Sequence, residues 1–308
     1  MKVARFAYAG GEGDRIGILC APGASAPGGG DDGIIDFSAA FQAYRLIEEG
    51  CLEPLCTSML DLLEQGLFNR EVFEKVLNFV SERNLGEEFF VSSPRLLAPI
   101  NRPPKILALG RNYLGHARES GREAPPEPIV FCKASTSVIG PDEPVVCKKF
   151  LGRVDPELEL AVVIGKEGSD IPAEKASDHV AGYTIVNDVT ARDMQSADMK
   201  AANPWLRSKS IDTFCPMGPC ILLADEAPEP VSLDIELRVN GEVRQKDNTA
   251  NLLFKIPQLV EFISRHMTLQ PGDIISTGTP AGIQAVFPGD VMECRVEKIG
   301  VLRNPVVG

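Results

Sequence analysis

The chain has 308 residues, of which 44% are hydrophobic and 24% are charged, the composition of an ordinary globular protein. A chain of this length can bury a large core, in one domain or in a large and a small one. Its 43 Asp and Glu outnumber its 31 Lys and Arg, which gives a formal net charge of −12. That balance argues against a nucleic-acid partner, because too little positive charge is available to replace the counterions of phosphate groups.

Targeting segments and cysteine chemistry are also excluded. The first twenty residues lack the apolar core of a signal peptide, and no run of about 18 apolar residues could span a membrane, so we expect a cytoplasmic protein without a membrane partner. The eight cysteines include no C-x-x-C pair, and Cys51/Cys56 and Cys215/Cys220 each enclose four residues. This is not zinc spacing, and a reducing compartment disfavours disulfides, so we interpret the cysteines as small core residues.

Residues 1–95 predict a small N-terminal α+β module with a structural role, because they contain no group of side chains that suggests catalysis. Ser38 is the predicted N-cap of its first helix, and Gly50 is the predicted stop. The hydrophobic pattern and the turn residues predict strands over 3–10 and 15–20 around a turn at 10–14, a loop at 22–33, and helices over 38–50, 58–66 and 70–84.

A proline-rich linker is predicted over 92–105, and the main domain then covers residues 104–308. This region alternates short β-type runs with loops, and only residues 173–180 and 256–267 have a convincing helical pattern. So few helices exclude a βα barrel or a doubly wound sheet. Asn240-Gly241 lies between two alternating strands and predicts a β-hairpin. The main domain is therefore predicted to be a β-rich roll or sandwich, in an α+β chain.

Three carboxylates stand at the ends of two apolar runs. Glu157 and Glu159 open an apolar strand, and residues two apart on a strand face the same side. Asp188 follows the next apolar run, with Arg192 and Gln195 beyond it. An exposed strand end with solvated charges would explain the two glutamates alone. The three carboxylates together, with no Cys or His among them, suit a hard cation such as Mg²⁺ or Mn²⁺ better than zinc.

Eight segments occur in the order seen in the fumarylacetoacetate hydrolase family, which the region 104–308 therefore resembles: ILALGRNYLGHARE, PIVFCKASTSVIGP, ELELAVVIGK, AGYTIVNDVTARDMQ, KSIDTFCPMGP, VNGEVRQKDNT, LQPGDIISTGTPAGI and GDVMECRVEKIGVLRNPV. Residues 1–95 resemble, more weakly, the small N-terminal module of many bacterial members. The resemblance implies a mixed β-sandwich roll that usually forms a homodimer. It also implies Mg²⁺- or Mn²⁺-dependent chemistry on 2-oxo or 1,3-diketo acids, most often C–C bond hydrolysis or decarboxylation.

The resemblance assigns roles where the motifs match. The family's metal ligands fall on Glu157, Glu159 and Asp188, the carboxylates already reached from strand geometry. Lys209 is the lysine of the family's K-x-x-D-T motif. One local departure is the proline in RVDPELEL, where many members have an aromatic or Asp–Tyr element; both glutamates stay in place.

Other matching positions concern the substrate and the acid–base chemistry. Arg192 and Gln195 match polar positions of the N-D-x-x-x-R-D-x-Q motif, and Thr279 lies in the T-G-T-P loop that helps to hold substrate. His116 and Glu119 match the histidine–glutamate pair of the acylpyruvase-like branch. Spacing alone would make this pair a solvated surface turn; among the other motifs it becomes a candidate acid–base pair.

The chemistry that these residues suit is cleavage of a C–C bond next to a ketone. His116 has the neutral pKa range of a general base, and on a short helix Glu119 can accept the proton of its other ring nitrogen. Lys209 would add positive charge near a developing oxyanion. We therefore expect hydrolysis of an acylpyruvate-type 1,3-diketo acid, or decarboxylation of an oxaloacetate-type acid, both through a metal-bound enolate.

Two further hypotheses use the same residues. One is tautomerisation of a 2-hydroxy-dienoate or dehydration of a 2-oxo-3-deoxy sugar acid on the same metal–enolate platform. The other is a catalytically silent, metal-binding scaffold, against which the complete set of carboxylates with Lys209 argues.

The remaining candidates have plainer interpretations. His179 and His266 lie near helix ends and are interpreted as capping or helix-dipole residues. STGTPAG lacks the spacing of a phosphate-binding loop and is not a nucleotide site. Lys133 either faces the substrate or caps a strand. Trp205 lies in a predicted loop, where it lines the pocket or anchors the loop.

Overall fold

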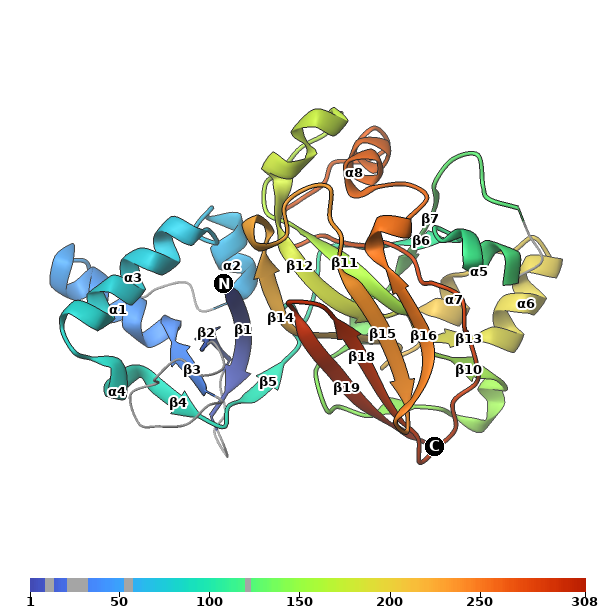
Figure 1. The fold of residues 1–308 in the computed structure, drawn as a ribbon, viewed down its shortest axis with the longest axis horizontal. Coiled ribbons are helices and arrows are strands. Elements are labelled where there is room, and N and C mark those ends of the chain that lie inside the picture. The colour runs from blue at the N-terminus through green and yellow to red at the C-terminus, as the bar shows by residue number, and fades with distance from the viewer. Residues whose placement is uncertain (9–13, 21–32, 53–57, 120–122) are drawn as a thin grey trace.

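The computed structural model describes residues 1–8, 14–20, 33–52, 58–119 and 123–308. A 12-stranded sheet is its main feature, and a 5-stranded sheet shares an apolar core with it. The helices of the N-terminal region and α8 lie around these sheets (Figure 1). The predicted strand-rich α+β class is confirmed, and two sheets packed on a common core are a sandwich arrangement.

The N-terminal elements gather at one end of the molecule (Figure 1). In chain order they are β1 (Lys2–Ala7), β2 (Arg15–Leu19), β3 (Gly33–Asp36), α1 (Phe37–Glu48), α2 (Met59–Glu64), α3 (Arg70–Glu82), α4 (Gly86–Phe89), β4 (Phe90–Ser92) and β5 (Arg95–Leu97). The two predicted strands are β1 and β2, which pair antiparallel, and the three predicted helices are α1, α2 and α3. Most of the predicted turn at 10–14 and loop at 22–33 lies outside the described residues.

Polar side chains cap the first three of the four described N-terminal helices. Asp36 caps α1 by accepting a hydrogen bond from the backbone N–H of residue 39, so the predicted cap at Ser38 is wrong. Strand β3 leads directly into α1, so the last strand residue takes the capping position. The Ser38 hydroxyl instead accepts a hydrogen bond from the backbone N–H of Ile16, at 2.9 Å. Ser58 begins α2 in a capping box, and Asn69 caps α3.

The main region begins at β6. Its elements are β6 (Ile106–Gly110), α5 (Leu114–Glu119), β7 (Ile129–Lys133), β8 (Val138–Ile139), β9 (Val145–Val146), β10 (Val154–Asp155), β11 (Leu158–Ile164), β12 (Val180–Asn187), β13 (Thr190–Ala191), α6 (Arg192–Lys200), α7 (Leu206–Lys209), β14 (Cys215–Leu223), β15 (Asp234–Val239), β16 (Glu242–Asn248), α8 (Ile256–Ser264), β17 (Ile274–Ser276), β18 (Val291–Val296) and β19 (Gly300–Val307). Short 3₁₀ helices cover Ser135–Ser137, Lys149–Leu151, Ala173–His179, Ala224–Glu226 and Thr249–Asn251. The helix predicted at 256–267 is α8, whereas the one predicted at 173–180 is 3₁₀, and α6 and α7 were not predicted.

Strand β11 lies at the centre of the large sheet, whose order is β4-β3-β2-β1-β14-β12-β11-β17-β6-β7, with β5 beside β1 and β8 beside β14. It runs antiparallel to β12 and β17, and all of its residues are buried. The second sheet has the order β16-β15-β18-β19-β9, and β10 pairs with β13. Asn240 and Gly241, both with positive φ, form the two-residue turn between β15 and β16, which confirms the predicted hairpin.

The alternating side chains of β11 serve two apolar cores. Leu160 belongs to the core that the two sheets share, together with Leu237 of β15. Val163 belongs to a second core with Phe73 of α3 and other side chains of the N-terminal helices. Because alternate residues of a strand face opposite sides, β11 is covered on both faces, and polar residues at its start are buried with it.

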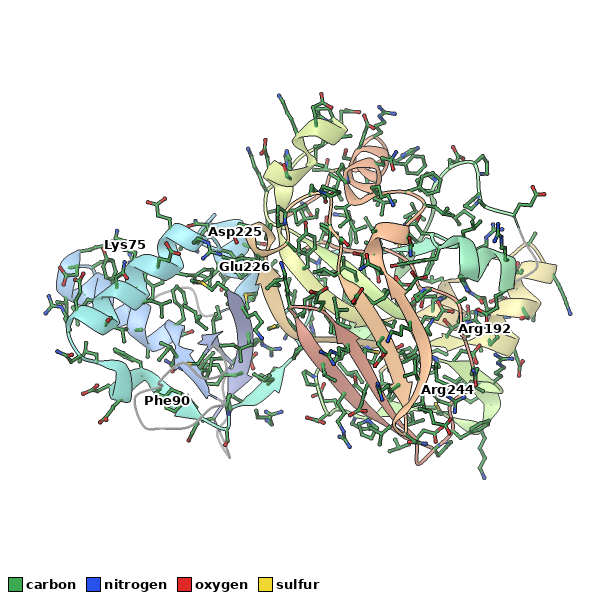
Figure 2. All side chains as sticks on the ribbon, viewed as in Figure 1. Lys75, Phe90, Arg192, Asp225, Glu226 and Arg244 are labelled. Carbon is green, nitrogen blue, oxygen red and sulfur yellow. The ribbon has the colours of Figure 1, made fainter. Side chains whose placement is uncertain are left out.

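The N-terminal elements join the main region through strand pairing and charge. Strand β1 pairs antiparallel with β14, which makes the two regions one continuous sheet. Arg70 of α3 donates a hydrogen bond to Asp225 at 2.9 Å and also pairs with Glu226, and both acidic residues lie at the junction in Figure 2. The division into residues 1–95 and 104–308 stays a prediction.

The cysteines fit the predicted core role only in part. Cys147, Cys215, Cys220 and Cys294 are buried, whereas Cys132 on β7 is exposed. Within the described ranges, none of the helices combines the length and the apolar character needed to traverse a membrane.

Candidate active site

Three carboxylates converge at one end of the central strands. Glu157 and Glu159 flank the first residue of β11, and Asp188 follows the last residue of β12. The register sets Leu158 opposite Asn187, so the start of one strand meets the end of the other. One oxygen of each carboxylate lies within 4.8 Å of the other two, and all three side chains are buried. The structure therefore brings together the three residues that the sequence named as metal ligands.

The loop after β17 and the end of β12 orient the two glutamates. Oε2 of Glu159 accepts hydrogen bonds from the Ser276 hydroxyl at 2.6 Å and from the backbone N–H of Gly278 at 2.8 Å. The backbone N–H of Glu157 donates to Oδ1 of Asn187 at 2.9 Å. Fixed carboxylate oxygens are the ligands that Mg²⁺ and Mn²⁺ prefer, so this cluster could hold such an ion.

Two buried lysines contact the carboxylates. Nζ of Lys209 lies 2.8 Å from Oε2 of Glu157 and also donates to Asp188. Nζ of Lys133 lies 2.6 Å from the other oxygen of Asp188 and donates to the backbone carbonyl of Lys209. The sequence left open whether Lys133 faces the substrate or caps a strand; in the structure it lies behind Asp188 as a buried counter-charge. Pairing of this kind is what makes buried charges tolerable.

Local charges move the pKa values of the two glutamates in opposite directions. Burial raises the pKa of Glu159, and the charge of Asp188 raises it further. Burial also acts on Glu157, but the charges of Lys209 and Arg192 outweigh it and hold the pKa of that carboxyl below its usual range. An excess of negative potential thus remains around Glu159. A divalent cation would relieve it, so both the donor atoms and the electrostatics of this site fit a metal ion.

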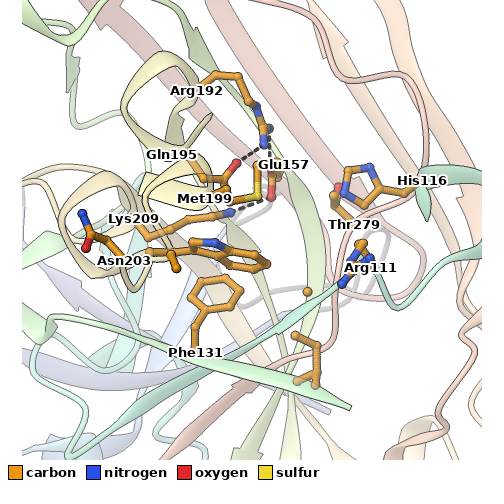
Figure 3. Close-up of a pocket in the computed structure, with 14 residues that line it drawn as sticks. Arg111, His116, Phe131, Glu157, Arg192, Gln195, Met199, Asn203, Lys209 and Thr279 are labelled. Atoms are coloured by element: carbon orange, nitrogen blue, oxygen red, sulfur yellow. Dashed lines mark hydrogen bonds and ion pairs between the residues drawn. The ribbon is translucent and has the colours of Figure 1, made fainter. Parts of the chain in front are cut away.

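A cavity of about 420 Å³ opens beside the carboxylates, a volume that suits a small molecule. Phe131, Met199 and Trp205 give it an apolar side, with the rings of Phe131 and Trp205 edge to face at 5.4 Å between centroids. Trp205 therefore lines the cavity, directly before α7. Besides Glu157, the polar lining consists of Arg111, His116, Arg192, Gln195, Asn203, Lys209 and Thr279 (Figure 3).

Arg192, the first residue of α6, links three polar groups around the cavity. Its Nη1 donates to Oε1 of Gln195 at 2.6 Å, and its Nη2 donates to Glu157 (Figure 3). Its Nε donates to Oδ2 of the fully buried Asp155 at 2.7 Å. Of the two predicted polar positions, Arg192 contacts Glu157 directly, and Gln195 is joined to it through Arg192. The sequence analysis missed Asp155, although an acidic residue two positions before the paired glutamates was a signal.

His116 and Glu119 share the short helix α5 but are not hydrogen-bonded to each other. Nδ1 of His116 is 3.8 Å from Oε2 of Glu119 and has no hydrogen-bond partner among the described residues. The Glu119 carboxylate instead accepts a hydrogen bond from the backbone N–H of Gly282 at 3.0 Å. Burial lowers the pKa of His116, and the charges of Arg192 and Lys209 also lower it. The charges of Glu157 and Glu119 act in the opposite direction on this pKa without outweighing burial, and the imidazole lines the cavity.

Two residues that the sequence analysis missed complete the polar surroundings. Gln245 of β16 is fully buried and donates a hydrogen bond to Oγ1 of Thr279 at 2.8 Å. A lone amide at an inward position of a hairpin strand was its signal. Arg111 lines the cavity with a left-handed backbone, φ 57°, and nothing in its sequence signalled that conformation.

The other two histidines lie away from the cavity, as expected. Nδ1 of His179 is 3.0 Å from the carbonyl oxygen of Lys166, and Nδ1 of His266 is 2.8 Å from that of Phe262. The His266 contact lies in the last turn of α8, as a capping interpretation predicts, whereas His179 contacts the carbonyl of a loop residue after β11 and does not cap a helix in this way.

The fold places a carboxylate cluster that could hold a divalent metal ion beside a cavity that suits a small molecule. Residues 105–307 match the family described as Fumarylacetoacetate (FAA) hydrolase C-terminal, and the chain belongs to this family. The predicted family is therefore confirmed.

Individual relatives are similar over nearly the whole chain. A mitochondrial oxaloacetate tautomerase of Bos taurus is 39% identical over 300 residues, which cover 94% of this chain and 88% of that protein. The structure of a fumarylacetoacetate hydrolase from Exiguobacterium antarcticum matches with a TM-score of 0.78 and 33% identity, over 100% of this chain and 99% of that chain. A maleylpyruvate hydrolase of Sphingobium sp. SYK-6, solved with manganese(II) and pyruvate, matches with a TM-score of 0.74 and 31% identity over the same shares.

Proposed function

We propose that this chain is a divalent-metal-dependent enzyme that interconverts the enol and keto forms of a small 2-oxo diacid such as oxaloacetate. The observation that carries the proposal is the buried cluster of Glu157, Glu159 and Asp188 beside a cavity that the imidazole of His116 lines. The similarity to an oxaloacetate tautomerase over 94% of this chain supports the choice of substrate.

Glu157, Glu159 and Asp188 would hold Mg²⁺ or Mn²⁺. When bound, the ion would draw electron density from the 2-oxo and carboxylate oxygens of the substrate. The hydrogens on C3, next to the ketone, would then be more acidic. Arg192 and Lys209 place two further positive charges at the same end of the cavity. Each such group is typically worth ~3 kcal/mol to a transition state in which negative charge develops on oxygen.

His116 would move the proton. In the enol-to-keto direction the substrate loses the hydroxyl proton from the enol oxygen and gains a proton on C3, so one base that accepts and returns a proton completes the reaction. No water is consumed and no carbon–carbon bond breaks. The absence of a hydrogen bond between His116 and Glu119 in the described structure is therefore compatible with this chemistry.

Substrate orientation would depend on Gln195, Thr279 and Arg111, whose side chains line the cavity around His116 and Lys209. The apolar side formed by Phe131 and Trp205 would exclude water from the opposite side of the substrate.

Hydrolysis of an acylpyruvate is the second candidate, and two observations favour it. Glu119 lies only 3.8 Å from His116, close enough for a small rotation to complete a water-activating pair. The maleylpyruvate hydrolase with manganese and pyruvate has the same fold over the whole chain. In this reaction the hydroxyl of water would add to the acyl carbon, the C–C bond would break, and pyruvate would leave after protonation of its carbanion.

Rapid-mixing assays separate these reactions. Metal-stripped protein would be reconstituted with Mn²⁺ and mixed with the enol form of oxaloacetate, with oxaloacetate at keto–enol equilibrium, and with acetylpyruvate, while the enol absorbance and released pyruvate are followed. Buffer with Mn²⁺ but no protein gives the uncatalysed rate. Metal-dependent loss of the enol band without pyruvate is expected.

Other results reassign the reaction. Pyruvate from acetylpyruvate would indicate hydrolysis, and pyruvate from oxaloacetate would indicate decarboxylation. Protein that binds no Mn²⁺ would overturn the metal assignment, and turnover that persists in the presence of a chelator would overturn the proposed mechanism.

A further inference from the structure

Gln245 connects the metal-binding strand to the loop that carries Thr279. Its side chain is fully buried on β16 and makes three hydrogen bonds. Oε1 accepts from the backbone N–H of Leu158 at 3.0 Å, and Nε2 donates to Oγ1 of Thr279 and to the carbonyl of Pro280, both at 2.8 Å. Leu158 lies between the two glutamates of the carboxylate cluster, so one amide links the backbone of that cluster to Thr279, which lines the cavity.

The backbone partners fix which way this amide points. The N–H of Leu158 can only donate, so it requires the amide oxygen, and the carbonyl of Pro280 can only accept, so it requires the amide nitrogen. If the Gln245 amide were flipped, its NH₂ group would face the N–H of Leu158 and its oxygen would face the carbonyl of Pro280. Neither pair could form a hydrogen bond. Nε2 must therefore donate to Thr279, and the hydroxyl oxygen of Thr279 must accept.

The hydroxyl hydrogen of Thr279 then has to point elsewhere. Among the protein groups that the structure describes, none accepts a hydrogen bond from it. Thr279 lines the cavity beside His116 (Figure 3). The hydroxyl oxygen of Thr279 already accepts a hydrogen bond from Gln245. Its hydrogen is therefore available to donate to a molecule in the cavity.

We infer that Gln245 is a positioning residue that makes Thr279 a hydrogen-bond donor to an anionic oxygen of the substrate. The inference rests on the proposed function, because it requires the cavity to hold a 2-oxo acid. It also gives the site a preference: the group beside Thr279 should be an acceptor such as a carboxylate or enolate oxygen. A substrate that presents a donor there would oppose the hydroxyl hydrogen.

Binding of oxalate to the Mn²⁺-loaded protein, measured by titration calorimetry, tests this inference without turnover. Oxalate carries only acceptor oxygens. Thr279→Val, which removes the hydroxyl and keeps the shape, should weaken oxalate binding by about 10-fold, the usual effect of a hydrogen bond to a charged group. Thr279→Ser, which keeps the hydroxyl, should retain most of the affinity.

A double-mutant cycle then isolates the role of Gln245. The carboxylate introduced by Gln245→Glu can only accept, so it should turn the Thr279 hydroxyl away from the cavity. Its added charge repels oxalate equally in every background. The loss of oxalate affinity caused by Gln245→Glu should therefore be about 10-fold larger when residue 279 is the native Thr279 or carries Thr279→Ser than when it carries Thr279→Val. Gln258→Glu, on α8 away from the cavity, is the control for the added charge.

The outcomes are distinct. Equal losses from Gln245→Glu in all backgrounds would overturn the role of Gln245 while leaving the proposed function intact. A native protein that binds Mn²⁺ but not oxalate would overturn both. If Gln245→Glu does not fold, Gln245→Met takes its place in the cycle. Its side chain cannot donate to Thr279 and accepts only weakly, so the hydroxyl is released rather than turned away. The loss of oxalate affinity should again be larger with Thr279 than with Thr279→Val, but by less than about 10-fold.

Discussion

The two ends of the cavity are built differently. At the metal-binding end, three buried carboxylates stand on paired central strands and contact two lysines, an arginine, a serine hydroxyl and a backbone N–H. At the acid–base end, His116 and Glu119 stand on a helix of six residues. Their side chains are 14% and 40% exposed, and Glu119 is anchored by one backbone group.

The difference follows from the cost of burial. A carboxylate inside a sheet is tolerated only with a full set of partners, so the metal-binding end must be formed when the chain folds. A pair on a short helix, with its histidine mostly buried and its carboxylate partly exposed, has no such requirement and can change its hydrogen bonds during the reaction. Substitutions at the first end should therefore alter metal affinity and stability, and those at the second should alter the rate alone.

The largest effect is expected from Glu159→Gln. Loss of a ligand charge should weaken Mn²⁺ binding at least about 100-fold. The same change should raise the melting temperature of the metal-free protein, because it removes a buried charge that Asp188 repels. Calorimetric titration and thermal unfolding measure both, with the exposed Glu242→Gln as control. Unchanged Mn²⁺ affinity would show that the ion binds elsewhere.

His116→Ala should come next. Removal of a general acid–base group typically lowers a rate about 10²- to 10⁴-fold, and because His116 is separate from the carboxylates, Mn²⁺ affinity should stay within about 2-fold. Steady-state kinetics at saturating Mn²⁺ would measure the first and titration the second. Native turnover in this variant would assign proton transfer to another residue.

Lys133→Met tests whether the buried carboxylates need their counter-charges for the stability of the fold. Breaking a buried ion pair by removing one partner costs about 3 kcal/mol, and here it leaves one oxygen of Asp188 without its counter-charge. Mn²⁺ should recover part of this loss, because a cation on the carboxylate cluster replaces the missing charge. Denaturant unfolding with and without Mn²⁺ measures the free energy of unfolding of both proteins. Equal losses of this free energy under the two conditions would show that a cation does not replace the charge of Lys133.

Glu119→Gln should separate the two candidate reactions. Tautomerisation needs only His116, so its rate should fall by less than about 3-fold, whereas a hydrolysis that depends on the pair should fall about 100-fold. The amide oxygen can still accept the Gly282 hydrogen bond, so α5 should keep its place. A large loss of enol–keto conversion would mean that Glu119 acts directly in that reaction.

The smallest effect concerns pH. Because burial lowers the pKa of His116, its neutral form persists below the ordinary histidine range, and the acid limb of kcat/KM should lie below pH ~6.5. The charge of Glu119 opposes this shift, so Glu119→Gln should move the limb to still lower pH. Pre-steady-state rates over a pH series at fixed Mn²⁺ measure both shifts. A limb above the ordinary range would contradict a base held neutral by burial.

The convergence of the three carboxylates could be predicted from the sequence because the pattern there is local. Charged residues at the ends of apolar strands are conspicuous, and the antiparallel register of β11 and β12 then brings Glu157, Glu159 and Asp188 together. The hairpin at Asn240-Gly241 was equally clear, because two adjacent residues must accept positive φ.

Features that depend on distant partners were not predictable in the same way. Helix α6 was missed because its buried residues, Gln195 and Asp198, are polar and leave no apolar stripe in the sequence. The positions of Lys133 and Gln245 depend on which strands lie beside them. The distance between His116 and Glu119 depends on Gly282, whose loop packs so closely on β16 that a Cβ would lie 2.0 Å from a backbone oxygen.

The left-handed backbone of Arg111 has a consequence for folding free energy. An L-residue in that conformation costs roughly 1–2 kcal/mol, whereas glycine adopts it without steric penalty. Arg111→Gly would therefore relax the chain at the point where it removes a guanidinium from the cavity. The native arginine carries strain that a simpler residue would not. Stability and recognition are thus in opposition at a single φ angle, and a variant that gained stability from glycine there would be expected to lose affinity for its substrate.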